Sequence, residues 1–149
     1  MSEKTVATNR KASFEYFLLE RYEAGIVLQG SEIKAARAGQ MSLSEAFVRV
    51  EPDGAWLIDA YIAPYDPASR FNHDPRRPRR LLLHKREILE LWNKARQKGM
   101  TIIPTRAYLK NGRLKVEIAL ARGKRVHDKR EAIAERDRRR EEEREFRIR

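Results

Sequence analysis

The chain has 149 residues, no cysteine and a formal net charge of +11. The length suits one domain with a modest core, and the lack of cysteine excludes disulfides, thiolate metal sites and cysteine nucleophiles. The strong positive charge predicts a polyanionic partner, with nucleic acid favoured over an anionic membrane. The first residues lack the apolar core of a signal peptide, and no apolar run approaches the roughly 18 residues that span a bilayer. We therefore expect a cytoplasmic protein.

The N-terminal part of the chain divides into a polar start and a region rich in aromatic and aliphatic residues. Residues 1–12 are expected to form a flexible lead-in. Residues 13–28 are rich in β-forming side chains and predict a strand, with Gly25 at a bend or bulge.

A short helix is expected next, with Ser31 as its cap, Glu32 in its positively polarised first turn and Gly39 at its end. Lys34 and Arg37 are three residues apart and share one face of this helix, where they could hold phosphates.

The middle of the chain predicts a hairpin and a long loop. Alternating side chains at 46–51 and 56–62 flank the turn sequence Pro52-Asp53-Gly54. Residues 63–80 are rich in Pro and Arg and predict a loop, and the apolar run at 81–83 suits a short buried strand.

The longest helical pattern runs from about residue 85 to 98 and has one apolar stripe. Two strands follow at 101–109 and 113–121, joined by Asn111-Gly112, the strongest hairpin signal in the chain. Pro104 must lie at an edge or a bulge because it has no amide hydrogen. Together these elements predict a mainly β chain, with about six antiparallel strands forming a small curled barrel over 13–123 and two to three flanking helices.

Residues 124–149 form a basic tail that contains few apolar side chains. Such a segment buries too little apolar surface to offset its loss of conformational entropy. We expect it to be disordered in the free protein and to become helical on a charged partner. Opposite charges at helical spacing, such as Glu135 and Arg139, support that helix. A membrane-bound helix is a weaker reading because Ile133, Phe146 and Ile148 make no continuous apolar face.

The densest basic cluster of the barrel predicts a phosphate site. It consists of Arg76, Arg77, Arg79 and Arg80 and continues to Lys85. Neighbouring arginines repel one another unless an anion lies among them, and their planar groups suit phosphates and bases. Three tyrosines could stack on bases, although packing in the core or at its rim is the better interpretation of each one: Tyr61, Tyr65 and Tyr108.

The sequence offers little for catalysis. It has no glycine-rich loop ahead of a lysine, and His73, His84 and His127 lack the spacing of metal ligands. We expect no enzyme activity, no metal, no cofactor and no small-molecule substrate.

Several motifs in a fixed order resemble the SsrA-binding protein (SmpB) family. The longest is Glu-Ala-Gly-Ile-Val-Leu-Gln-Gly-Ser-Glu-Ile-Lys at 23–34. The others lie at 9–12, 37–39, 74–76, 79–83, 99–104, 121–125 and 128–130. Each block alone is weak, but the whole series is specific.

The resemblance implies an oligonucleotide-binding (OB) type barrel that binds the tRNA-like domain of transfer-messenger RNA. It further implies delivery of this RNA to stalled ribosomes, where translation resumes and the incomplete peptide is tagged. The tail would then lie in the vacant mRNA channel, near the decoding centre formed by small-subunit RNA.

Asn9, Glu23 and Leu82 match family positions that grip the RNA, and Arg10 and Lys11 belong to the same block as Asn9. A carboxylate such as Glu23 can accept from base or ribose donors, or it can simply pair with Arg21. Leu82 can pack on a base or sugar, or it can be core. Six tail positions match the segment that engages the decoding region: Lys124, Arg125, His127, Asp128, Lys129 and Arg130.

The tail departs from the family pattern in two places. His127 stands where the family often has an aromatic residue, and an imidazole can still stack on a base. The acidic triple Glu141-Glu142-Glu143 argues against phosphate contacts by the far tail. Two other functions stay open, a general single-strand-binding module and an RNA-modifying enzyme.

Overall fold

The structure is a computed structural model that describes residues 3–64, 73–124, 134 and 136–140. Its helices are α1 (Lys11–Glu15), α2 (Gly30–Arg37) and α3 (Lys85–Ala95). Residue 134 and residues 136–140 in the tail are also helical. The strands are β1 (Glu3–Thr8), β2 (Tyr16–Ile26), β3 (Met41–Ser42), β4 (Phe47–Glu51), β5 (Gly54–Ile58), β6 (Tyr61–Ile62), β7 (Arg79–Leu82), β8 (Met100–Lys110) and β9 (Arg113–Gly123).

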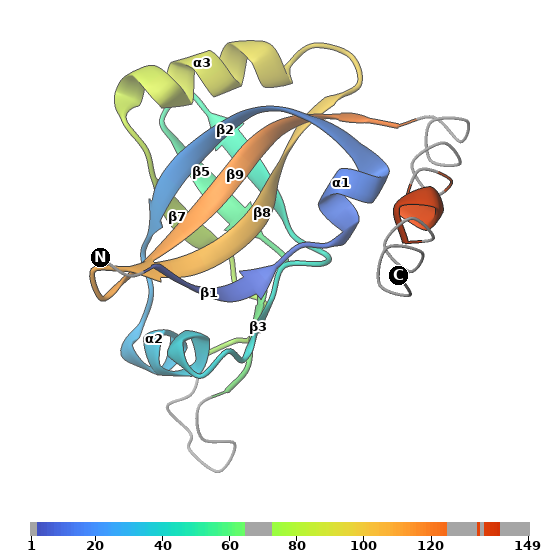
Figure 1. The fold of residues 1–149 in the computed structure, drawn as a ribbon. Helices are drawn as coiled ribbons and strands as arrows, with labels where there is room; N and C mark the ends of the chain where they lie inside the picture. The colour runs from blue at the N-terminus through green and yellow to red at the C-terminus, as the bar shows by residue number, and fades with distance from the viewer. Residues whose placement is uncertain (1–2, 65–72, 125–133, 135, 141–149) are drawn as a thin grey trace.

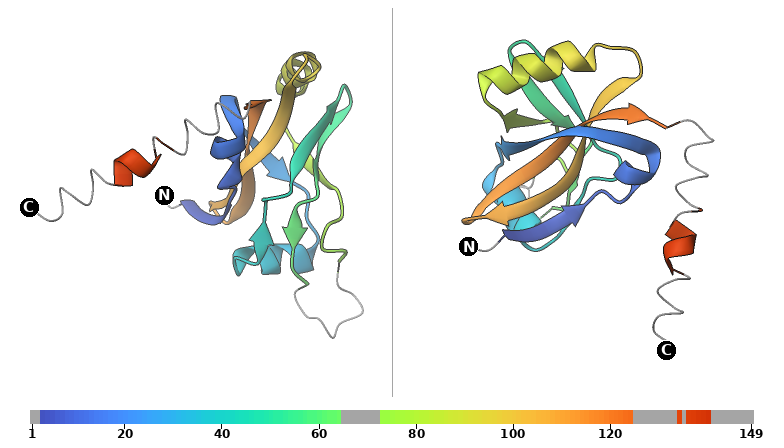
Figure 2. Two further views of the ribbon diagram at one scale, coloured as in Figure 1. Left: turned by 90° about the vertical axis from the view of Figure 1, so that its right-hand side faces the viewer. Right: turned by 45° about the horizontal axis from the view of Figure 1, so that its top comes forward.

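Seven of these strands form one antiparallel sheet in the order β1-β8-β9-β2-β7-β5-β4, while β3 and β6 pair separately. The sheet curls so that β4 approaches β8, which gives the barrel seen in Figures 1 and 2. Helices α3 and α2 lie at opposite ends of the barrel (Figure 1). The prediction of a mainly β antiparallel barrel with flanking helices is confirmed, and the described residues contain nine strands instead of about six.

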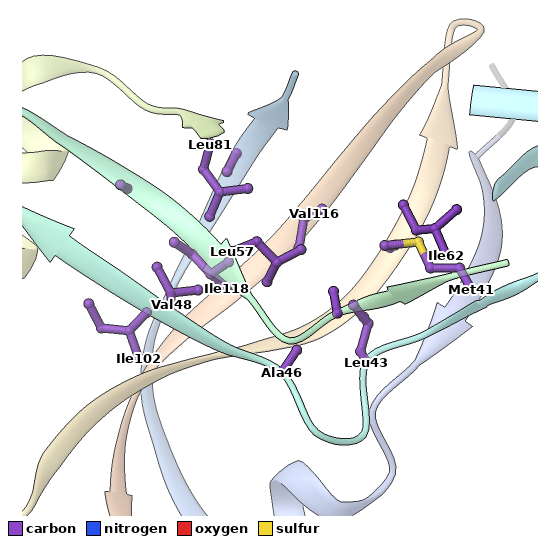
Figure 3. Close-up of a cluster of buried hydrophobic side chains, with 14 of the residues drawn as sticks. Met41, Leu43, Ala46, Val48, Leu57, Ile62, Leu81, Ile102, Val116 and Ile118 are labelled. Carbon is purple, nitrogen blue, oxygen red and sulfur yellow. The ribbon is translucent and has the colours of Figure 1, made fainter. Parts of the chain in front are cut away.

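The core lies inside the curled sheet. Alternate residues of the strands point inward, and Leu57, Leu81, Val116 and Ile118 are almost completely buried there (Figure 3). Helix α3 adds Leu91, which is fully buried. Since a buried leucine stabilises the fold by roughly 1.5–3 kcal/mol, this alternation fixes which face of each strand looks outward.

The flexible lead-in predicted for residues 1–12 is wrong over the described residues. Strand β1 pairs along β8, and the Asn9 amide donates to the Thr105 carbonyl at 2.8 Å. Val6 and Ala7 pack on the core. The strand could not be predicted from its short, polar sequence, because its hydrogen-bond partners lie in β8, about a hundred residues away.

Two details of β2 also differ from the prediction. Residues 13–15 belong to α1, and the irregularity in β2 falls between Leu18 and Glu20 rather than at Gly25. Gly25 instead faces Leu82 of β7, and a Cβ atom there would lie 3.3 Å from the Leu82 Cβ. Glycine at this position therefore lets the two strands and the Leu82 side chain approach closely.

The last hairpin forms as predicted. Asn111 and Gly112 have φ values of 52° and 77°, as a tight turn between antiparallel strands requires. The register of β8 and β9 shifts between Pro104 and Arg106, so Pro104 lies at a bulge, one of the two places predicted for it.

Candidate nucleic-acid interface

A buried ion-pair cluster joins α2 to β7. Glu32 is fully buried and accepts hydrogen bonds from the Nε of Arg79 at 2.6 Å and the Nε of Arg77 at 3.1 Å. It also accepts from the backbone N–H of Gln29 at 2.8 Å, so Gln29 and not Ser31 caps α2. Burial alone would raise the pKa of Glu32, but these hydrogen bonds hold the pKa below its ordinary value. Glu32 therefore stays ionised.

Arg79 is consequently unavailable to phosphate, which corrects the prediction. Its side chain is 0% exposed, and its guanidinium also donates to the carbonyls of Ala60 at 2.7 Å and Pro75 at 3.1 Å. Arg77 is partly exposed and faces Glu32. The arginine run was expected to form a phosphate site, but two of its four members hold a buried carboxylate.

The other two arginines, Arg76 and Arg80, are exposed. The Arg76 guanidinium lies 5.5 Å from the centre of the Tyr61 ring and that of Arg80 lies 5.8 Å from the centre of the Trp56 ring. Both keep donors facing solvent because a guanidinium held over a ring still presents its N–H edge.

Leu82 and Glu23 lie together on the outer face of β7 and β2. Leu82 is 54% exposed, although leucines are usually buried, and it pairs with Gly25, two residues from Glu23. A groove of about 380 Å³ runs beside them. Its walls are Glu23, Gly25, Leu82, Leu83, His84, Glu87 and Lys115. We call this the Glu23–Leu82 groove.

Glu23 is held ionised at the rim of this groove. Tyr108 donates its hydroxyl to Glu23 Oε2, and the Lys110 Nζ lies 3.3 Å from the same oxygen. The Tyr108 hydrogen bond, followed by Lys110, lowers the pKa of Glu23 below its ordinary value. Burial and the neighbouring carboxylate raise the pKa of Tyr108, so its hydroxyl remains a donor.

These contacts exclude two expectations. Arg21 pairs with Glu117 at 3.3 Å instead of with Glu23. Tyr108 is only 2% exposed, so it positions Glu23 and does not stack on a base. Sequence reasoning missed the Tyr108–Glu23 contact because it depends on how β8, β9 and β2 align. Ala107 is buried in the core, so Tyr108 points to the outer face of β8, where the Arg106 guanidinium lies 4.1 Å from the centre of its ring.

A second groove, of about 260 Å³, shares Gly25, Leu82 and Lys115 with the first. Arg37 contributes to its wall and donates to the Gly112 carbonyl at 2.9 Å, while Arg113 and Lys115 bring further positive charge. Lys34 on α2 and Lys85 at the start of α3 are exposed but line neither groove. The structure thus brings Glu23, Leu82 and Arg37 together, across β2, β7 and α2.

The N-terminal candidates lie elsewhere. Asn9 is 8% exposed, and its Nδ2 donates to the Pro104 carbonyl at 2.9 Å, so its side chain braces the β1–α1 turn against β8. Arg10 and Lys11 are exposed, and Lys11 lies 3.7 Å from Glu45. None of the three lines the Glu23–Leu82 groove.

Within the described structure, the predicted tail contacts the folded body through Lys124 and Arg136. The Arg136 guanidinium lies 5.7 Å from the centre of the Phe14 ring in α1. The Lys124 Nζ donates to the Ser13 carbonyl at 2.9 Å and lies 5.1 Å from the centre of the Phe17 ring. The remaining tail candidates lie outside the described residues: Arg125, His127, Asp128, Lys129 and Arg130. Tyr65 also lies outside them.

Metal-ligand clusters and membrane-spanning helices are both absent from the described residues. No group of three His, Asp or Glu residues there could hold a metal ion, and no helix there is long and apolar enough to cross a membrane. His73 is buried between Ser31 Oγ and the Ile62 carbonyl, at 2.9 Å from each, which is a structural role.

These features define a small antiparallel β-barrel with a grooved, basic outer face. The chain belongs to the SmpB family, since the family model described as "SmpB protein" matches residues 6–148. It is 58% identical to an SsrA-binding protein of Sulfurihydrogenibium sp., over 98% of this chain and 96% of that one. It is 57% identical to an SsrA-binding protein of Persephonella marina, over 95% and 93% of the two chains.

A solved structure matches as well. It is described as "tmRNA-SmpB: a journey to the center of the bacterial ribosome", and its similarity has a TM-score of 0.69 at 46% identity. The match covers 85% of this chain and 92% of the other. The resemblance found in the sequence motifs is therefore confirmed.

Proposed function

We propose that this protein is a non-enzymatic adaptor that binds the tRNA-like domain of transfer-messenger RNA and delivers it to stalled ribosomes. Its relatives are called SsrA-binding proteins, and the matching solved structure concerns tmRNA-SmpB and the bacterial ribosome. Both partners are found in the bacterial cytoplasm, the location that the sequence predicts.

The observation that carries the proposal is the exposed Leu82 beside the ionised Glu23. A leucine on this surface can pack on a base or sugar, while the carboxylate accepts from base or ribose donors. Arg37, Arg113 and Lys115 line the second groove together with Leu82 and can neutralise phosphates. An apolar contact, an acceptor and several cations on one face suit a folded RNA better than a bare polyanion.

The tail has a separate task in this proposal. Residues beyond Lys124 enter the mRNA channel when no message occupies it and become helical there. An intact message excludes the tail by its volume, so ordering of the tail reports a stalled ribosome. The body supplies RNA affinity, and the tail supplies recognition of the stall.

A competition experiment tests the RNA-binding part. The full-length protein is bound to a labelled tRNA-like domain and challenged with unlabelled RNAs of equal length, one tRNA-like and one unstructured. We expect the folded RNA to compete at much lower concentration. Equal competition would instead support a general single-strand-binding module. Incubation with Mg²⁺ should leave the RNA intact, whereas cleavage or modification would support an enzyme.

A further inference from the structure

Three side chains form a row across the outer face of β4, β5 and β7. Arg49 of β4 is the register partner of Trp56 in β5, and Trp56 is the register partner of Arg80 in β7. The guanidinium carbons of Arg49 and Arg80 lie 5.4 and 5.8 Å from the centre of the Trp56 ring. A single indole is therefore within cation–π range of two arginines.

The row is an outward-facing feature of the barrel. Arg79 and Leu81 of β7 and Leu57 of β5 point inward and are buried, so their neighbours in sequence point outward. Arg49 is 55% exposed, and Arg80 is exposed as well.

Glycine makes room for this arrangement. A Cβ atom at Gly54 would lie 3.2 Å from the Trp56 ring and 3.4 Å from Nη2 of Arg80. The Arg80 Nη2 also donates to the Asp53 carbonyl at 3.4 Å. The hairpin turn thus helps to hold the ring and one guanidinium in place.

The row has more positive charge than its own contacts neutralise. Glu51 lies 3.7 Å from the Nε of Arg49 and is 49% exposed, while Arg80 donates to a neutral carbonyl, that of Asp53. Two guanidinium groups beside one ring repel each other, and an anion between them relieves that repulsion. Arginine alternating with an aromatic side chain is a pattern that suits RNA, because guanidinium groups bond phosphates and rings contact bases.

The row borders the Glu23–Leu82 groove. Arg80 and Leu82 are two residues apart on β7 and project from the same outer face. A strand of RNA that covers Leu82 can continue across β7 and β5 towards β4. This continuity, together with the charge of the row, identifies the occupant as the RNA already held in the groove.

We propose that Arg49, Trp56 and Arg80 form an extension of the RNA interface, in which the two arginines bond backbone phosphates and the indole contacts a base or ribose between them. This inference rests on the proposed function, because its ligand is the same tRNA-like RNA. The binding footprint then spans four strands from β2 to β4.

The first test compares two double variants of the full-length protein. R49Q/R80Q removes two charges from the row. R96Q/K98Q removes two charges beyond the end of α3 and also breaks a similar pair, since the Arg96 guanidinium lies 5.0 Å from the Trp92 ring. We expect R49Q/R80Q to weaken binding of the tRNA-like domain about 10-fold and to reduce the salt slope by about 1.5, the value for two lost phosphate contacts. We expect R96Q/K98Q to bind like the wild type.

The second test leaves the row intact. Tryptophan occurs only at positions 56 and 92 in this chain, so W92F makes Trp56 the sole reporter. Addition of the tRNA-like RNA should then change Trp56 fluorescence, whereas Trp92 in W56F should respond little.

The outcomes separate the two proposals. Failure of the wild type to bind the tRNA-like RNA contradicts the proposed function itself. If the wild type binds normally, either of two results overturns the proposed extension alone. One is an unchanged affinity and salt slope in R49Q/R80Q, and the other is no change in Trp56 fluorescence when RNA is added to W92F.

Discussion

The Nε atom of Arg79 lies 2.6 Å from a carboxylate oxygen of Glu32, and neither side chain is exposed. Arg79 lies in β7 and Glu32 in α2, and the two residues are 47 positions apart in sequence. Backbone groups and Arg77 provide further hydrogen bonds, so the buried charges are well satisfied. The pair fixes the start of α2 against the strand that carries Leu82, and it thereby sets the shape of the RNA-facing surface.

Replacing Arg79 with methionine should destabilise the protein strongly. The change leaves the buried carboxylate of Glu32 with only part of its neutralising charge, and breaking a buried pair costs about 3–5 kcal/mol. The free energy of unfolding in urea measures this loss. Arg80→Met, at the exposed neighbouring position, is the matched control and should cost less than about 1 kcal/mol. Equal effects of the two variants would contradict the structural role of Arg79.

The same pair predicts an acid-sensitive contribution to stability. The pKa of Glu32 is lower in the folded protein than the ordinary value of 4.5 that it regains on unfolding. Its contribution is therefore complete above pH 4.5 and falls as the pH drops through the folded pKa. The difference in unfolding free energy between the wild type and Glu32→Gln should shrink from pH 6 to pH 3. A constant difference over this range would show that ionisation of Glu32 is not what stabilises the fold.

The sequence predicted features that depend on local pattern. The Asn111-Gly112 hairpin, the inward positions Val116 and Ile118 of the last strand and the bulge at Pro104 all follow from residues close together in the chain. The barrel class followed from the number of such hairpins.

Features that depend on residues far apart in the chain could not be predicted from local sequence patterns. Glu32 has the sequence context of a first-turn acid, and its burial depends on Arg77 and Arg79, 45 and 47 residues away. Even so, extending the strand pattern at 81–83 backwards by two residues would have placed Arg79 inside and Arg80 outside. The prediction of a loop over residues 63–80 concealed this alternation. The strand at the N-terminus was hidden for a similar reason, because β8 supplies its hydrogen bonds.

Replacing Glu23 with glutamine should weaken RNA binding without changing the fold. Glutamine has similar size but loses the charge and one acceptor, and a charge-assisted hydrogen bond contributes about 1.5–3 kcal/mol. We therefore expect affinity for the tRNA-like domain to fall by at least about 10-fold. Glu20→Gln on the same strand is the control, because the Glu20 carboxylate pairs with Lys94 at 2.7 Å and lies outside the groove. Similar losses in both variants would indicate a general effect of charge on β2.

Replacing Leu82 with serine should separate binding from stability. Since Leu82 is 54% exposed, its loss should change the unfolding free energy by less than about 0.5 kcal/mol. Its burial against a base or sugar in the complex contributes about 1.5–3 kcal/mol, so RNA affinity should fall about 10-fold or more. Leu89→Ser provides a control at an exposed leucine of α3, 43% exposed and outside both grooves. A large stability loss in Leu82→Ser would place Leu82 in the core instead.

Deleting residues 124–149 should abolish peptide tagging on stalled ribosomes while sparing affinity for the tRNA-like domain. The grooves that we assign to RNA are built from α2 and the barrel, and none of the tail residues that the structure describes lines them. The deletion also removes the contact of Lys124 with the Ser13 carbonyl, so a shorter deletion that keeps Lys124 is the matched variant. Gel-shift affinities and a reconstituted tagging reaction measure the two activities. If either deletion lowers RNA affinity as much as Glu23→Gln does, the tail shares in holding the RNA, and the division of labour between barrel and tail is wrong.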